Sequence, residues 1–546
     1  MMVSKDSGAG LDVIVVGGGH NGLVAAGYLA KAGLKVAVLE ARHILGGPCG
    51  AIEFLPGYRS AITNSPGSFE PRILRDLDLE GHGLRFHRTD PNVVHVFPEG
   101  CFIGWRDREA VATQLDAFAP GEAARYNSLL SRLEELGRHL GVSVFEPSRS
   151  LAEVARHVPK AHERLFEQVF LGSLLELLDE NLRSEQAKAL LGMVALNATL
   201  TPPSAPGTAI GLMMRPISLA SSPVLEANDP RRTALRGSTG LPIGGMGAII
   251  DALQSVLLAH GGEVHTNMRV ASVLHEHGRA VGVVTSSGRE FRARRIISAI
   301  NPRTLFADML DDDAVGAEMR REVAAVPMRG SAFKMFLALD GLPRYRGLPD
   351  GMNSAQVAGT QFRIASSLAH IEDAVLDGLR GVPSDEPIMW GLMPTVSSPG
   401  LAPAGKHIMS VNVWHAPHDL RQGSWDTEKE VFGRRCIDVL GRLMPDLQDR
   451  IIGHHFLSPV DLEHELGLVG ANITHGDMLP NNLFGARPHV AANDYRTPLE
   501  GLYLSASGTW PGGYVTGIPG HNTAAAVLAD IANATHRHVR DATWNS

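Results

Sequence analysis

The chain has 546 residues, 44% of them hydrophobic and 20% charged, which is the composition of a globular protein large enough for two or three domains. Its net charge of −8 argues against a nucleic-acid partner, and its three scattered cysteines, which form no C-x-x-C pair, exclude a disulfide-cycling enzyme. Because no apolar run approaches the roughly 20 residues of a membrane span and the N-terminus is too short and polar for a targeting peptide, we expect a cytoplasmic protein and leave peripheral membrane contact open.

The first predicted strand leads into a glycine turn of the dinucleotide-binding type. Residues 13–16 are apolar enough for a buried strand, and Gly17, Gly19 and Gly22 follow in G-x-G-x-x-G spacing. Gly17 permits the tight turn, Gly19 lets the backbone approach a pyrophosphate, and Gly22 lets the next helix pack closely against the sheet. This spacing alone is weak evidence, so the interpretation depends on the elements that follow it.

The elements after the turn complete the motif. A helix begins near His20 and Asn21, directs its free N–H groups and positive end at the phosphates, and ends at Gly33. A second strand over 35–39 then leads to Glu40, whose carboxylate can accept hydrogen bonds from both hydroxyls of an adenosine ribose. Its negative charge disfavours the 2′-phosphate of NADP. The sequence therefore predicts a site for FAD or NAD.

The residues after Glu40 favour FAD. Ala41 and Arg42 are followed by a second glycine pair, Gly46 and Gly47. This pattern resembles the extended fingerprint of the amine oxidase and phytoene desaturase flavoproteins, in which the pair lets the chain pass tightly along the ribityl and pyrophosphate groups. An NAD dehydrogenase has no need of the pair, although an ordinary turn is the alternative.

The cofactor domain is predicted to consist of three separated pieces, 1–80, 241–310 and 491–546. In the second piece a helix starts after a Gly-Gly-Met-Gly sequence, and a strand over 264–270 and β-hairpins follow. In the third piece a strand over 502–504 runs into a glycine-rich turn and an alanine-rich helix. The pieces together predict an α/β fold with a two-part Rossmann-like FAD-binding domain of the glutathione reductase or amine oxidase type.

The two remaining segments, 81–240 and 311–490, are predicted to form an inserted α+β domain that covers the substrate. Strands such as 333–339 alternate with helices, and the chain is strongly helical over 152–196. That stretch carries an apolar stripe, which we interpret as core, with a lid or membrane-facing surface as the alternative. The stripe consists of Phe166, Val169, Phe170, Leu174, Leu177 and Leu178.

Five segments in combination carry a family resemblance. They are Gly18–Leu23, Gly244–Gly247, Asn472–Gly476, Tyr495–Leu504 and Pro511–Gly520. With them the chain resembles the phytoene desaturase-like flavoproteins, in the branch of the bacterial beta-carotene ketolase and pyridine nucleotide-disulphide oxidoreductase domain-containing protein 2. The resemblance spans essentially the whole chain and implies FAD as the cofactor. Pro48–Cys49, Trp510 and Tyr514 depart from the family pattern where the flavin is expected, so the substrate can differ from those of named relatives.

The resemblance also implies which residues contact FAD beyond the first glycine turn. Gly508 and the turn from Pro511 to Gly513 are expected to bring backbone N–H groups to the flavin ring and ribityl end, with Gly517 in the same segment. Val270 is expected to hold the adenine through its backbone. The alanine-rich helix that follows would direct its positive end at the flavin and stabilise negative charge on the reduced ring.

Two residues are candidates for proton transfer, and each has a structural alternative. His475 lies in the matched Asn-Ile-x-His-Gly segment and imidazole titrates near neutrality, but a histidine that only bonds backbone explains it equally well. Lys334 lies within the apolar strand over 333–339. It could hold a water molecule near the flavin N5 atom, as a lysine does in amine oxidases, with carboxylate pairing as the alternative.

Four residues are assigned to the substrate pocket, namely Cys49, Trp510, Tyr514 and His415. Core packing is the alternative for the two aromatic residues. Cys49 could attach flavin covalently or line the pocket, and a buried inert thiol is the alternative. The 24 histidines show no recognisable zinc spacing, so no metal site is predicted.

These observations predict an FAD-dependent oxidoreductase that desaturates or dehydrogenates a largely apolar small molecule and passes the electrons to oxygen or a quinone. Two alternatives stay open. One is oxygen insertion into, or isomerisation of, a carotenoid-like substrate, and the other is a non-catalytic flavin-containing interaction protein. Homo-oligomerisation also stays open.

Overall fold

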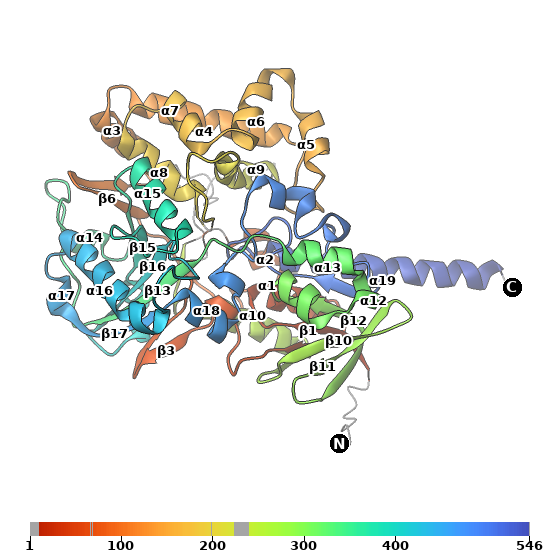
Figure 1. The fold of residues 1–546 in the computed structure, drawn as a ribbon. Helices are drawn as coiled ribbons and strands as arrows, with labels where there is room; N and C mark the ends of the chain where they lie inside the picture. Colours follow the sequence, from red (N-terminus) through yellow and green to blue (C-terminus); the bar gives the residue numbers. More distant parts are fainter. Residues whose placement is uncertain (1–9, 66, 68, 198, 223–239, 545–546) are drawn as a thin grey trace.

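Two seven-stranded sheets and a layer of helices make up the fold (Figure 1). The computed structural model describes residues 10–544 apart from 66, 68, 198 and 223–239. Residues 1–9, on which the expectation about a targeting peptide rests, lie outside the described residues. No helix in the described ranges is both long enough and apolar enough to cross a membrane.

The first sheet joins distant parts of the chain in the order β10–β11–β12–β1–β2–β9, with β18 paired to β12. The core strands β12, β1, β2, β9 and β18 pair in parallel, and β10–β11–β12 form an antiparallel meander. This arrangement confirms the predicted α/β class. The strands are β1 (Leu11–Val16), β2 (Val36–Leu39), β9 (Glu263–His265), β10 (Val270–Glu276), β11 (Arg279–Thr285), β12 (Glu290–Ser298) and β18 (Leu502–Leu504).

The first sheet is covered on both faces, which explains why β1 is apolar throughout. Val13 and Val15 belong to a core shared with α1 (His20–Lys31), α10 (Gly247–Ala259) and α19 (Ile518–Trp544). Ile14 and Val16 belong to the core of the opposite face, which α13 (Ala317–Ala324) and the β10–β11 hairpin complete.

The predicted single strand over 264–270 is wrong, because the chain turns between β9 and β10. Asn267 has a φ of 56°, and its N–H donates to the Arg42 carbonyl over 2.9 Å. The N–H of Met268 donates to the Glu40 carbonyl over 2.8 Å. The turn therefore ties this part of the chain to the residues that follow β2.

The second sheet has the order β17–β13–β16–β15–β14–β6–β7, so it takes strands from both inserted segments. Helix α16 (Trp425–Leu443) packs on one face through Phe432, Cys436 and Leu440. The other face looks toward the helical layer. The strands are β6 (Val93–Phe97), β7 (Gly100–Gly104), β13 (Ala332–Leu339), β14 (Gln361–Ile364), β15 (Met389–Leu392), β16 (His407–Trp414) and β17 (Ile451–Leu457).

The helical layer lies at the top of Figure 1 and divides the predicted helical stretch into several short helices. Serine N-caps at Ser150, Ser173 and Ser184 each accept a backbone hydrogen bond and start a new helix. The apolar stripe of this stretch is core, as interpreted, because five of its six side chains are buried there. The helices are α3 (Arg108–Phe118), α4 (Glu122–His139), α5 (Leu151–His157), α6 (Glu163–Phe170), α7 (Leu174–Asn181), α8 (Glu185–Ala195) and α9 (Met214–Ala220).

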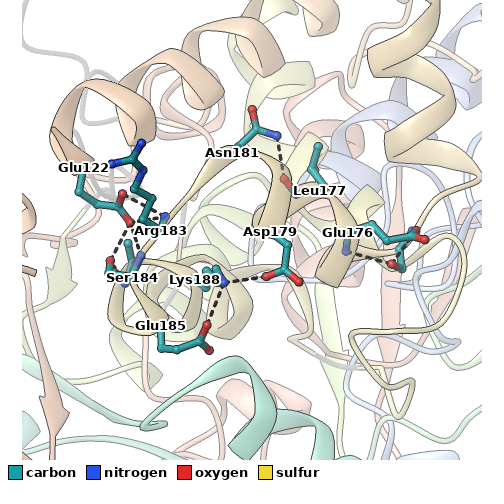
Figure 2. A network of polar contacts seen from close by, with 11 residues as sticks. Glu122, Glu176, Leu177, Asp179, Asn181, Arg183, Ser184, Glu185 and Lys188 are labelled. Atoms are coloured by element: carbon teal, nitrogen blue, oxygen red, sulfur yellow. Dashed lines mark hydrogen bonds and ion pairs between the residues drawn. The ribbon is translucent and has the colours of Figure 1, made fainter. Parts of the chain in front are cut away.

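Polar contacts join α4 to the start of α8 (Figure 2). Glu122 is fully buried, and its carboxylate accepts hydrogen bonds from the Ser184 N–H (2.8 Å), the Ser184 hydroxyl (2.7 Å) and the Arg183 N–H (3.1 Å). Lys188 of α8 bonds Glu185 at 2.8 Å on the outside of the same junction. The buried carboxylate thus satisfies N–H groups that the start of α8 would otherwise leave unpaired.

We expect Glu122→Ala to lower the free energy of unfolding of the helical layer, by about 1–3 kcal/mol for each buried N–H left unpaired. Glu185→Ala is the matched control, because the Glu185 side chain is 53% exposed and Lys188 keeps its ion pair with Asp179. Thermal unfolding followed by circular dichroism measures both variants. Equal shifts in melting temperature would contradict the role of Glu122.

Candidate active site

The glycine turn after β1 leaves an open space at the N-terminus of α1. Gly17 has a φ of 99°, and a Cβ on Gly22 would lie 2.3 Å from the Gly17 carbonyl oxygen, so both positions require glycine. A Cβ on Gly19, in contrast, would meet no atom within 4 Å. The turn therefore brings bare backbone to a space that a pyrophosphate can occupy.

Glu40 is held beside this turn by its own carboxylate. The carboxylate accepts hydrogen bonds from the N–H of Gly18 (2.8 Å) and of Arg42 (2.9 Å), and the residue is 8% exposed. The turn at Met268 bonds the Glu40 carbonyl, and Val270 follows at the start of β10. The structure thus brings the chain around Val270 to Glu40 and Arg42, which lie far from it in the sequence.

The second glycine pair packs against the first turn. The Gly46 N–H donates to the Gly18 carbonyl over 2.8 Å, and Gly46 has a φ of 107°. A Cβ on Gly46 would lie 2.6 Å from the Gly50 nitrogen, whereas a Cβ on Gly47 would meet no atom within 4 Å. Gly46 is therefore needed for the close turn, and Gly47 opens onto free space as Gly19 does.

Several buried polar atoms in this region make no hydrogen bond within the described chain. They include Nε2 of His20 and Oδ1 of Asn21, in the first turn of α1, and Nδ1 of His475. Buried polar side-chain atoms nearly always have a partner, so these atoms indicate a ligand-binding site. Together with the open space at Gly19 and Gly47, they fit a bound dinucleotide.

Arg487 ties the loop around residue 475 to the C-terminal segment that follows β18. It is fully buried, and its guanidinium donates to the carbonyls of Thr474, Asn482 (3.1 Å) and Ser507 (2.9 Å). In the same region, a Cβ on Gly513 would lie 2.2 Å from Thr474. Arg487 is not among the predicted site residues, although an arginine inside a loop rich in asparagine and glycine is a usable signal.

His475 lies at this junction with a φ of 56°. Burial, assisted by the positive charges of Arg487 and His20, lowers its pKa to about 3. Its carbonyl oxygen would lie 3.1 Å from a Cβ on Gly508, so the two predicted residues are neighbours. With this pKa the imidazole is neutral at physiological pH, which removes the reason for preferring His475 as the proton-transfer group.

Lys334 is 1% exposed in β13, and two amide oxygens surround its amine. Nζ donates to Oδ1 of Asn64 (2.7 Å) and of Asn412 (2.9 Å), and the Ser410 hydroxyl also donates to Asn64. The expected alternative of a carboxylate partner is wrong, because no carboxylate pairs with Lys334 among the described residues. Burial without a counter-charge lowers the pKa of Lys334 well below its usual value.

A cavity of about 260 Å³ lies between the helical layer and the second sheet. Asn64 and Asn412, the two partners of Lys334, line it together with Tyr514 and the adjoining Pro511 and Gly513. Its opposite wall is formed by apolar side chains of the helical layer. These include Leu130, Leu133, Leu191, Met193, Leu212 and Met214.

Three of the four predicted pocket residues do not line this cavity. Trp510 is fully buried in the core, stacks on Phe484 and donates its indole N–H to the Ser143 carbonyl over 3.0 Å. His415 is buried just beyond the last residue of β16, and burial lowers its pKa to about 4. Cys49 is a buried thiol, 3.9 Å from Nδ1 of His20, and burial raises its pKa to about 11. Of the four, Tyr514 lines the cavity.

A group that could hold a metal ion, which sequence analysis missed, lies in the helical layer. Glu135 and His139 are four residues apart on α4, and His162 lies beside them, with ligand atoms within 4.8 Å of one another. The i, i+4 spacing of Glu135 and His139 was the available signal. Glu135 is exposed, and the group lies outside the cavity described above.

Comparisons with known proteins agree with this architecture. The family model described as flavin containing amine oxidoreductase matches residues 22–458, more than half of the chain. The rat protein named pyridine nucleotide-disulfide oxidoreductase domain-containing protein 2 is 30% identical, over 96% of this chain and 94% of its own. A limonene dehydrogenase polypeptide of Castellaniella defragrans is 25% identical, over 95% of both chains.

The solved structure of cyclohexylamine oxidase from Brevibacterium oxydans shares the fold, with a TM-score of 0.59 and 16% identity over 96% of this chain and 100% of that one. The match to the rat protein confirms the branch that the five sequence segments indicated. The chain belongs to the family of flavin-containing amine oxidoreductases, and its cofactor is FAD.

Proposed function

We propose that this oxidoreductase removes two hydrogens from a compact, largely apolar organic molecule. The cavity carries the proposal, because its apolar wall faces residues that we expect to contact the flavin, from Pro511 to Tyr514. Its volume of about 260 Å³ is close to the lower end of the range for small-molecule pockets, about 300–1,000 Å³. A compact molecule fits this volume better than a long polyene. The name of the relative limonene dehydrogenase supports a small apolar substrate.

In this proposal, each part of FAD is bound by different residues of the dinucleotide site. Glu40 binds the ribose hydroxyls, Gly19 and the N-terminus of α1 bind the pyrophosphate, and the backbone of Val270 holds the adenine. The other predicted contacts are Gly17, His20, Asn21, Gly22, Ala41, Arg42, Gly46, Gly47, Gly508, Pro511, Gly513 and Gly517.

The start of α19 adds an electrostatic contribution at the cavity. Thr516 and Ile518 line it, and α19 begins at Ile518. The first N–H groups of a helix carry a partial positive charge, so this end stabilises negative charge that develops nearby during reduction.

Bound FAD supplies the acceptor for the hydride that leaves the substrate, and the protein must receive the other hydrogen, which leaves as a proton. Lys334 can accept it, since a neutral amine has two N–H donors and one lone pair. Asn64 and Asn412 take both donors, which leaves the lone pair for a proton. Because Lys334 lies behind these amides, we expect the proton to reach it through a water molecule bound at the cavity surface. Electrons then pass to oxygen or a quinone.

Anaerobic mixing tests the proposed reaction. With compact cyclic and branched hydrocarbons and alcohols, including limonene, we expect one compound to bleach the visible absorbance of the bound flavin and to gain a double bond. Label from ¹⁸O₂ in the product would instead indicate oxygen insertion, and product formation without net oxidation would indicate isomerisation. If no compound bleaches the flavin while a protein partner binds tightly, the interaction alternative holds and the proposal fails.

We expect Gly19→Ala to weaken FAD binding without unfolding the protein. The added methyl group meets no protein atom, so its cost arises only when the pyrophosphate enters the same space. Gly400→Ala, whose methyl group also meets no atom, is the matched control. FAD content and melting temperature of the purified variants measure the effect. Full FAD occupancy in Gly19→Ala would contradict this assignment.

We expect Lys334→Met to lower kcat by about 10²–10⁴-fold, the usual contribution of a general base, while FAD content is unchanged. Because burial lowers the pKa of Lys334, the wild-type amine is neutral down to a lower pH than an ordinary lysine, and turnover should fall as the pH drops through that lowered pKa. The variant should lose this acid limb of the kcat profile.

Two further variants sharpen this test. Lys160→Met, at an exposed position, should leave the profile unchanged. His475→Asn keeps a residue that tolerates positive φ, and it should not move the acid limb. If His475→Asn removes the limb and Lys334→Met does not, the proton-transfer assignment is wrong.

A further inference from the structure

One face of the second sheet forms the floor of the cavity and carries an ordered row of polar and aromatic side chains. Arg363 of β14 pairs with Trp390 of β15, Trp390 with Asn412 of β16, and Asn412 with Lys334 of β13. Directly paired residues project to the same face of a sheet. Arg363, Trp390 and Asn412 all line the cavity. The row thus leads from a guanidinium to the amides around Lys334.

The charged residues of the cavity are mainly cations. Among the described residues that line it, the charged ones are Arg106, Arg215, Arg363 and Glu134. Glu134 lies 3.8 Å from Arg215, and Nε of Arg106 donates to the Thr89 carbonyl over 2.9 Å. The described part of the lining therefore has three guanidinium groups and one carboxylate.

Trp390, the strand neighbour of Arg363, has an indole N–H without a hydrogen-bond partner among the described residues. Its indole Nε1 is buried and makes no hydrogen bond within the described chain, although it lines the cavity. A buried donor without a partner indicates an acceptor supplied by a ligand. The Trp390 ring also stacks on that of Trp414, with centroids 6.4 Å apart, and both rings offer apolar surface next to the guanidinium.

We propose that the substrate carries an oxyanion, a carboxylate or a phosphate, on its apolar body. Arg363 and Nε1 of Trp390 bind the oxyanion, with Arg106 and Arg215 adding positive charge nearby. This inference rests on the proposed dehydrogenation and names the substrate class for the same cavity.

The sheet sets the distance between the oxyanion and the reacting carbon. Arg363 and Asn412 lie two strands apart, which is about 10 Å at the spacing of neighbouring strands. The apolar body between them covers Trp390 and Trp414. The reacting C–H bond then lies beside Asn412 and the amine of Lys334.

Binding to the FAD-loaded protein tests the inference without a known substrate. The probes are octanoate, octyl phosphate, methyl octanoate and octylamine, which share a chain of similar length and differ in charge. Titration calorimetry and the shift of the flavin absorbance give Kd. We expect at least one of the two anions to bind about 10- to 100-fold more tightly than the ester and the amine, as expected for a charge-assisted contact. The stronger of the two anions identifies the head group.

Variants locate the contact. Arg363→Gln should abolish the preference for the anion, Arg363→Lys should retain part of it, and the exposed Arg380→Gln should leave it unchanged. Trp390→Phe, which keeps an aromatic ring but removes the indole N–H donor, should weaken anion binding by a smaller factor. The wild-type comparison of anion and ester stands even if Arg363→Gln fails to fold.

Two outcomes overturn the inference. One is an ester or amine that binds as tightly as the anions, and the other is no anion binding at millimolar concentration. If a neutral molecule bleaches the flavin anaerobically and becomes dehydrogenated, the proposed function holds and only the oxyanion inference fails. If the anions bind but no compound of either kind bleaches the flavin, the proposed function fails instead.

Discussion

The architecture depends on the close approach of three chain segments, which glycine alone permits. A Cβ on Gly22 would lie 2.3 Å from the Gly17 carbonyl oxygen, and a Cβ on Gly520 would lie 2.3 Å from the Asn21 carbonyl oxygen. The absence of both methyl groups lets α1 lie against the glycine turn and lets α19 lie against α1. Residues almost 500 positions apart therefore meet at the N-terminus of one helix, where we propose that the cofactor binds.

This close packing also places the segment before α19 next to the second sheet, so that both contribute to the cavity. The segment before α19 contributes to the cavity, and the same cavity is bounded by the floor of the second sheet and by apolar helices. Arg487 holds the loop around His475 to Ser507 in the core beside the cavity. The result is a largely apolar space with a few fixed polar groups, in which electrostatic contacts are stronger than in water.

Lys334 and Arg363 are both basic residues of this space, but their protonation differs. Among the described residues, the hydrogen-bond partners of the Lys334 amine are amide oxygens and no carboxylate pairs with it, so burial favours its neutral form, which can accept a proton. The guanidinium of Arg363 keeps its charge at physiological pH, which suits it to the anion binding that we propose. Two cationic residue types on one row of the sheet therefore suit different steps, chemistry at one end and recognition at the other.

The sequence by itself determined the cofactor motif, the α/β class and the family, because these depend on local spacing. The turn at Gly17 to Gly22 and the acid Glu40 follow one another along the chain, and their geometry is set by neighbours in sequence. Only the tertiary structure decided the cavity. Strand pairing places Arg363 and Asn412 in one row with Lys334, and Asn64 reaches the Lys334 amine from a separate loop. The same holds for Trp510 and Tyr514, four residues apart, of which one faces the core and the other the cavity. Their direction depends on packing against distant segments, which the periodicity of a single chain does not encode.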